Sequence, residues 1–383
     1  MKRKRSNRAT YFFILALAGL ATAWWFNGMA VLHAGDYIKD GFTSDVDWVY
    51  SLDLLITGVA AMSFIVIEGR RKNMRHLWAY VLVSLVTAVA FAFPFFLAMR
   101  ELHLRKVWLA GGRIDTFEFD KHRVDVWVPA DVSPTTPVLV MHDGKNVFFS
   151  EHSTHGPTWG VLDAIREGRI RADKKPLIIA VWGLSGETRT LELGPEDIYV
   201  NHPEIWDTLP NGLRPAVIEP MGNAYQALLA TKILPDIAAR YGVSVSPERT
   251  ALAGSSMGGL SSLYGLAKYP DVWGTALCYS THWPFGFETM VDKLTSLLPP
   301  AGRHRIWTDS GTLDIDAAYP PYHLQAVEKL EGLGYRYEVD YVGAIYPNTG
   351  HNEAWWAGRV EHPINWWLNP DEPRATKDQV MGR

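Results

Sequence analysis

Residues 251–270 read ALAGSSMGGLSSLYGLAKYP, an apolar run followed at once by glycines and serines and then by a helical pattern. Glycine weakens both strands and helices, and an exposed serine buries little apolar surface, so this segment is a poor core element. Gly254, Ser256 and Gly258 match the GxSxG pattern in the strand–turn–helix context that a nucleophile elbow requires. We therefore predict that Ser256 is a nucleophile and that Ser255 packs or caps.

Short apolar runs without polar alternation surround this elbow, and helix-like stretches separate them. They lie at 136–144, 175–184, 249–256, 274–281 and 304–311. Such runs indicate strands that are buried on both faces, and the intervening helices indicate a parallel sheet covered on both sides. The fold class that we predict is α/β, with a mostly parallel sheet.

A serine hydroxyl is a weak nucleophile at neutral pH, so Ser256 needs a base and an orienting acid later in the chain. His351 follows an apolar run and a Pro-Asn-Thr-Gly loop, which suits the base. The stretch IWTDSGTLDIDAAY offers Asp314 as our first choice of acid and Asp316 as the second. We interpret Asp309 as a polar residue at the end of a strand.

An oxyanion hole needs two backbone N–H groups that point at the developing charge. The residue after the nucleophile, Met257, is the first candidate donor. The second is the amide of Lys145, next to Gly144, because VLVMHDGKN ends a predicted strand in a suitable loop. The alternative is that Asp143 and Gly144 form an ordinary turn.

Five stretches occur in the order found in one group of esterases of the α/β-hydrolase superfamily. They are VLVMHDGKNVF, LAGSSMGGLSSLYGLAKYPDVWG, YSTHW, DSGTLDID and GHNEAWWAGR. Residues 111–369 thus resemble the group that includes enterochelin esterases, feruloyl esterases and mycolyltransferases. The resemblance implies the same nucleophile, base and oxyanion donors, and an acid at Asp314 or slightly later. It also implies an α/β-hydrolase fold. The members of this group usually have glutamine where this chain has Lys145.

Three apolar stretches near the N-terminus, at 10–33, 48–67 and 77–99, are each long enough to cross a membrane. The first could instead be a cleaved secretory signal, but two further stretches follow it, so we predict a membrane domain over 1–103 with the lipid bilayer as partner. Residues 10–102 also resemble small bacterial three-helix membrane domains of unknown function.

Positive charge sets the orientation of membrane helices. The N-terminus and the loop EGRRKNMRH are basic, whereas the loop AGDYIKDGFTSDVD is acidic. Three crossings of an inner membrane would then place the hydrolase domain on the periplasmic or extracytoplasmic face. Arg100, Arg105 and Lys106 oppose this reading, because they follow the third stretch on the side that it makes external.

These residues predict a membrane-anchored serine esterase that acts on a small-molecule ester. The alternatives are an acyltransferase for envelope lipid or sugar and a non-catalytic binding or sensor module. Trp283, Trp355 and Trp356 are either substrate contacts or packing residues. We expect no metal and no organic cofactor, and the net charge of −4 gives no reason to expect nucleic acid. Residues 370–383 form a polar tail.

Overall fold

A computed structural model describes residues 2–33, 35–173, 175–208, 219 and 221–370 of the chain. The chain divides into two compact units, Met1–Trp108 and Leu109–Arg383. Each unit is described below by itself. The predicted polar tail lies outside the described residues, except for residue 370.

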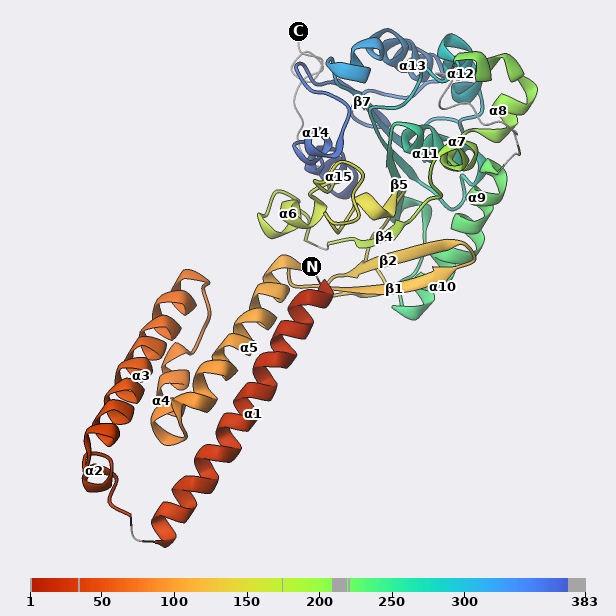
Figure 1. The fold of residues 1–383 in the computed structure, drawn as a ribbon. Helices are drawn as coiled ribbons and strands as arrows, with labels where there is room; N and C mark the ends of the chain where they lie inside the picture. The colour runs from red at the N-terminus through yellow and green to blue at the C-terminus, as the bar shows by residue number, and fades with distance from the viewer. Residues whose placement is uncertain (1, 34, 174, 209–218, 220, 371–383) are drawn as a thin grey trace. The chain divides into compact units, whose positions relative to one another are not determined.

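The second unit is built on one eight-stranded sheet in the order β1-β2-β4-β3-β5-β6-β7-β8 (Figure 1). The strands are β1 (Arg113–Phe119), β2 (His122–Val128), β3 (Val138–Met141), β4 (Leu177–Val181), β5 (Thr250–Ser255), β6 (Thr275–Tyr279), β7 (Arg305–Ser310) and β8 (Tyr341–Ile345). β1, β2 and β4 pair antiparallel, and the other neighbours pair parallel. The predicted α/β class with a mostly parallel sheet is confirmed.

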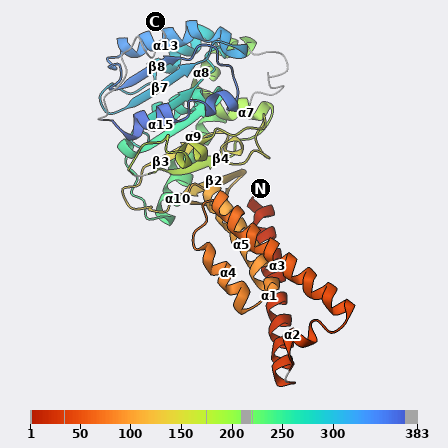
Figure 2. The ribbon, with the colours of Figure 1, turned by 90° about the vertical axis from the view of Figure 1, so that its left-hand side faces the viewer.

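The α-helices of this unit connect the strands and cover the sheet, and short 3-10 or π turns join them (Figure 2). The helices are α6 (Val161–Arg166), α7 (Glu187–Leu193), α8 (Glu196–Asn201), α9 (Gly222–Leu228), α10 (Leu234–Arg240), α11 (Met257–Lys268), α12 (Phe287–Ser296), α13 (Pro320–Gly332), α14 (Glu353–Ala357) and α15 (Glu361–Leu368). The turns are η1 (Gly144–Asn146), η2 (Pro203–Thr208), η3 (Leu229–Ile233), η4 (Pro247–Arg249) and η5 (Asp314–Ala318).

The core of this unit lies between the sheet and the helices that pack on it. The five apolar runs identified in the sequence are β3 to β7, and every residue of β3, β4, β5 and β6 is buried. Helix α11 packs on β5 and β6. Because parallel strands end at the same edge of a sheet, this topology brings the loops after β3, β5, β7 and β8 toward one another.

The first unit is helical, with α1 (Lys2–Leu32), α2 (Tyr37–Asp40), α3 (Asp45–Arg71), α4 (Leu77–Val86) and α5 (Val89–Trp108). Helix α3 begins with a capping box, in which Ser44 and Asp47 satisfy each other's backbone N–H groups. Among the described residues, two helical segments are long and apolar enough to cross a membrane, Asn7–Leu32 and Asp45–Arg71. α1 and α5 lie side by side (Figure 1).

The single third helix predicted over 77–99 is wrong, because the chain reverses there. Helix α4 ends at Val86 after ten residues, and α5 begins at Val89 and returns along α4. The Thr87 hydroxyl donates to the Val83 carbonyl at 2.7 Å, a contact that competes with the helix backbone and bends helices. Helices α4 and α5 therefore form a hairpin, with the Tyr80 ring 5.4 Å from that of Phe96.

Candidate active site

Ser256 occupies a sharp turn between β5 and α11. Its φ of 57° and ψ of −122° lie outside the regions that residues with a side chain favour. A Cβ atom on Gly254 would come within 2.4 Å of the Gly258 carbonyl oxygen, so the turn requires glycine there. The Ser256 amide donates to the carbonyl of Tyr279 at 2.9 Å, which fixes the turn to β6. Ser255 is the last residue of β5 and is buried.

His351 lies in the loop between β8 and α14, beside a buried carboxylate. Its Nδ1 atom is 2.6 Å from Oδ1 of Asp316. The other carboxylate oxygen accepts hydrogen bonds from Ser280 Oγ at 2.6 Å and from the Gly311 amide at 2.8 Å. Asp314 begins the same turn, η5, but it is exposed and has a left-handed φ of 55°. The structure thus brings Asp316, our second choice of acid, to His351.

The pKa of Asp316 is lowered from its ordinary value. Burial alone would raise that pKa, but the hydrogen bond and charge of His351 outweigh burial, with help from the bonds of Ser280 and Gly311. The group is therefore a carboxylate at neutral pH. In that state it can hold the imidazole in one tautomer and stabilise a positive charge on it.

The buried ion pair of Arg359 and Asp309 contacts the Asp316 carboxylate through Ser280. The Arg359 side chain donates to Ser280 Oγ at 2.9 Å and to Asp309 Oδ1 at 3.0 Å. Trp356 Nε1 donates to the same Ser280 hydroxyl at 3.1 Å, and its ring centroid lies 5.1 Å from that of His351. Asp309, which we interpreted as a polar strand end, is fully buried and belongs to this network.

Tyr319 reaches Ser256 from the turn that carries Asp316. Its hydroxyl is hydrogen-bonded to Ser256 and to Nδ1 of His282. Burial, together with the charges of His351 and Arg189, lowers the pKa of His282 to about 3, so His282 is neutral at neutral pH. Within the described residues, the structure shows no hydrogen bond between Ser256 and His351.

The two predicted oxyanion donors lie on adjoining segments. Met257 is the first residue of α11, so its N–H has no acceptor within the helix and lies at the positive end of the helix dipole. Gly144 and Lys145 lie in η1, directly after β3. A Cβ atom on Gly258 would be 3.4 Å from the Cβ of His142. The loop that carries Lys145 therefore adjoins the start of α11.

The three tryptophans proposed as substrate contacts or packing residues occupy different environments. Trp283 is only 1% exposed and belongs to the hydrophobic core. Trp356 is 4% exposed and packs on His351. Trp355 is 39% exposed, and a Cβ on Gly350, next to His351, would be 3.0 Å from its indole nitrogen. Trp355 alone among the three is therefore accessible beside His351.

Two family models match the chain, one in each unit. The model described as "Putative esterase" matches residues 205–361, and that of a protein family of unknown function, DUF2834, matches residues 11–102. An iron(III) enterobactin esterase of Dickeya dadantii (strain 3937) is 26% identical over 238 residues, which cover 57% of this chain and 50% of that protein. The chain thus spans about half the length of this curated relative.

Two solved structures are similar to the second unit, and the first of them shows the same fold. Enterobactin hydrolase IroE in complex with DFP has a TM-score of 0.50 and 17% identity, covering 67% of this chain and 96% of that one. The enterobactin esterase FES from Shigella flexneri, in the presence of enterobactin, has a TM-score of 0.49 and 17% identity, covering 68% and 59%. The second unit is an esterase-family α/β-hydrolase domain.

Sequence reasoning missed an ion pair beside the loop of the esterase domain that carries Gly144 and Lys145. Asp143 accepts two hydrogen bonds from the guanidinium of Arg189, at 2.7 and 2.6 Å. Burial would raise the pKa of Asp143, but the charge and hydrogen bonds of Arg189 outweigh it and lower that pKa. The pair holds the residue before Gly144 in its left-handed conformation, φ 52°. Nothing in the sequence links Arg189, 46 residues later, to this loop.

A second missed contact joins the loop that carries Lys145 to the loop that carries His351. Asn146 Nδ2 donates to Glu353 Oε1 at 2.7 Å, and Asn146 Oδ1 accepts from the amide of Thr154 at 3.0 Å. Glu353 is 2% exposed, and its Oε2 atom has no hydrogen-bond partner among the described residues. Glu353 follows His351 by two residues, so this contact sets the separation of the two loops.

Proposed function

We propose that the esterase domain hydrolyses a carboxylic ester through a covalent acyl-enzyme on Ser256. The observation that carries this proposal is the strained turn at Ser256 together with the His351–Asp316 hydrogen bond. The nucleophile, acid and base follow the chain order Ser, Asp, His that is typical of α/β-hydrolases.

In the first half of the reaction, His351 takes the proton of the Ser256 hydroxyl while the serine oxygen attacks the ester carbonyl carbon. The carbonyl oxygen becomes negatively charged and accepts hydrogen bonds from the amides of Met257 and Lys145. When this tetrahedral intermediate collapses, the C–O bond to the alcohol breaks, and the alcohol leaves with the proton from His351. Asp316 stabilises the imidazolium throughout.

In the second half, His351 takes a proton from water, and the resulting hydroxide attacks the acyl carbon. The bond to Ser256 breaks, the serine recovers its proton from His351, and the carboxylic acid leaves. The Ser256 hydroxyl must exchange its hydrogen bond to Tyr319 for one to His351 before the first step. Catalytic hydrogen bonds that are long or absent in a free enzyme tighten when substrate binds. The chemistry requires no metal or organic cofactor.

We propose a small ester as the substrate, with exposed Trp355 as a contact for an apolar or aromatic acyl group. The relatives named for enterobactin make siderophore esters the first class to test. Fluorophosphonate labelling of the full-length protein tests the nucleophile, and a panel of short-chain, long-chain, aromatic and siderophore esters tests the substrate. Ser256→Ala should abolish labelling and lower turnover about a million-fold, whereas Ser255→Ala should do neither. Labelling that survives Ser256→Ala would overturn the proposal.

We further propose that α1 and α3 anchor the enzyme in a membrane, and that the α4–α5 hairpin enters the bilayer only to its middle. Helix α5 begins beside the centres of the two long helices. A Cβ on Gly19 of α1 would lie 2.2 Å from the Ala90 carbonyl oxygen, and one on Gly58 of α3 would lie 3.4 Å from Val89 Cγ2. Pro94 has no N–H to donate to the Ala90 carbonyl, so Gly19 can approach it closely.

The other end of α5 lies level with the end of α3. The Arg100 guanidinium donates to Glu68 Oε1 at 2.6 Å, and His103 Nε2 lies 2.8 Å from the Lys72 carbonyl. The ring of Phe95 lies 6.0 Å from that of Phe13 near the start of α1, so α1 and α5 run antiparallel. In this arrangement, the start of α1, the basic loop after α3 and the exit of α5 share one side of the membrane.

Positive charge then determines which side of the membrane these segments occupy. Two crossings and a hairpin return the chain to the side of the basic N-terminus, which is the cytoplasmic side. Arg100, Arg105 and Lys106, which opposed the three-crossing prediction, lie on the same side in this arrangement. We therefore propose that the esterase domain is cytoplasmic, in place of the extracytoplasmic location that three crossings would give.

A further inference from the structure

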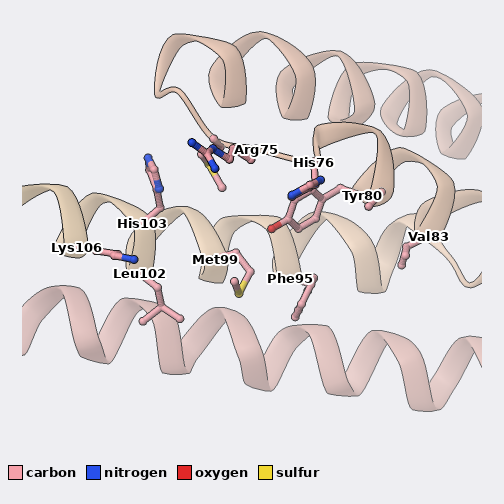
Figure 3. Close-up of a pocket in the computed structure, with 11 residues that line it drawn as sticks. Arg75, His76, Tyr80, Val83, Phe95, Met99, Leu102, His103 and Lys106 are labelled. Atoms are coloured by element: carbon pink, nitrogen blue, oxygen red, sulfur yellow. The ribbon is translucent and has the colours of Figure 1, made fainter. Parts of the chain in front are cut away.

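A cavity of about 520 Å³ opens between α4, α5 and the segment that precedes α4 (Figure 3). It lies within the first unit and is separate from the active site. Its lining changes character along its length. Arg75, His103 and Lys106 lie toward one end, and Val83 and Phe95 lie toward the other.

The orientation of this cavity follows from the hairpin. Its basic residues lie at the level of Lys72, where the chain leaves α3, because His103 contacts the Lys72 carbonyl. Its apolar residues lie toward the turn between α4 and α5, which reaches the centre of α3 at Gly58. In the proposed membrane arrangement, the basic end faces the headgroups of the cytoplasmic leaflet and the apolar end faces the acyl chains.

The nearby carboxylates do not neutralise the basic end. Glu68 and Glu101 both accept hydrogen bonds from Arg100, at 2.6 and 2.9 Å. Among the described residues, neither Arg75 nor Lys106 forms an ion pair with a carboxylate. The cavity therefore has positive charge at its basic end and apolar walls beyond it.

We propose that this cavity binds one anionic phospholipid, with its phosphate at Arg75 and Lys106 and one acyl chain along Tyr80, Val83 and Phe95. Basic pockets between membrane helices on the cytoplasmic side suit such headgroups. An apolar wall continuous with the basic end distinguishes a lipid from a free phosphate ion, which would leave that wall unfilled. This inference rests on the proposed membrane anchoring and is independent of the ester chemistry.

The test uses the full-length protein, purified in detergent and mixed with dioleoyl phosphatidylglycerol and dioleoyl phosphatidylcholine. Native mass spectrometry counts the lipids retained on each chain. We expect one retained phosphatidylglycerol, bound in preference to phosphatidylcholine. The variant Arg75→Gln/Lys106→Gln should weaken phosphatidylglycerol binding about 25-fold, at about fivefold for each basic residue. The matched control Arg70→Gln/Arg105→Gln removes two charges from the same side, outside the cavity, and should retain the lipid.

Three results would overturn the lipid site: equal retention of the two lipids, equal loss in both double variants, or displacement of phosphatidylglycerol by millimolar inorganic phosphate. Extraction of membranes at alkaline pH separates this failure from that of the anchoring proposal. A chain that stays in the membrane pellet but does not select phosphatidylglycerol contradicts only the lipid site. A chain released into the supernatant contradicts the anchoring, and esterase turnover reports on the ester chemistry alone.

Discussion

Nδ1 of His351 lies 2.6 Å from Oδ1 of Asp316, and that carboxylate is fully buried. Replacing Asp316 with Asn would remove the charge and allow the imidazole to adopt the wrong tautomer. We expect kcat to fall about ten-thousand-fold, as for other triad acids. Asp314→Asn is the matched control, because Asp314 is exposed and lies two residues earlier in the same turn. Steady-state kinetics compare kcat in the two variants, and thermal unfolding checks that both are folded. A larger loss of kcat in the Asp314 variant would refute this assignment.

The sequence predicted those features of the fold and the site that depend on local backbone structure. GxSxG between a strand and a helix implies the elbow, and the five apolar runs predicted β3 to β7, five of the six strands that pair parallel. The strands β1 and β2 were not predicted, because neither is a continuous apolar run. β1 is partly exposed, and β2 is mostly buried but contains His122, Arg123 and Asp125. Asp314 and Asp316 could not be separated, because both follow the Gly311 turn and only the rotation of η5 decides which one is buried.

Contacts between distant segments were beyond sequence reasoning for a different reason. The Arg189 and Glu353 contacts join loops that only the sheet topology brings together. The third apolar stretch shows the limit of hydropathy. A hairpin with two apolar arms has the same average hydropathy as one crossing helix, and only the reversal after Thr87 distinguishes them.

The Asn146–Glu353 contact gives a prediction about positioning. Glu353→Leu removes the acceptor of Asn146, so the loop that carries Lys145 should shift relative to His351. We expect kcat to fall between tenfold and a hundredfold, with a smaller change in KM, because the donor acts mainly on the charge of the transition state. Glu353→Gln keeps an acceptor oxygen and should retain most of the activity.

A double-mutant cycle with Asn146→Leu separates coupling from loss of packing. If the two residues act through their hydrogen bond, the double variant should lose little more activity than either single variant. Independent losses that multiply would show that Glu353 does not act through Asn146.

The buried histidine His142 predicts how stability depends on pH. Burial lowers its pKa in the folded chain to about 4, against about 6.5 when unfolded. Between these values the unfolded chain binds a proton that the folded chain does not, so the free energy of unfolding falls as pH falls. From pH 7 to pH 4.5 the loss from this group is about 2 kcal/mol.

His142→Asn tests this origin. The His142 Nδ1 atom lies 2.9 Å from the Tyr225 hydroxyl, and an asparagine amide can occupy that place without titrating. We expect the Tm of the variant to fall less than that of the natural chain between pH 7 and pH 4.5. Part of the fall should persist, because burial also lowers the pKa of His282 to about 3. Identical pH slopes for both proteins would exclude His142 as a source of acid sensitivity.

The hairpin makes a prediction about which sites share one side of the membrane. Three exposed residues report on it: Thr43 between α1 and α3, Arg70 at the end of α3, and Ser150 in the esterase domain. Each is changed to cysteine in turn and treated in intact cells with a membrane-impermeant thiol reagent. Cys278 is buried and gives little background.

With α5 returning to the side of Lys72, only the cysteine at 43 should react before the cells are permeabilised. If α4 and α5 instead formed one crossing, the cysteines at 43 and 150 would react together and that at 70 would not. Reaction at 150 without permeabilisation would therefore place the active site outside, and the contacts of Ala90 with Gly19 would not describe the membrane-inserted protein.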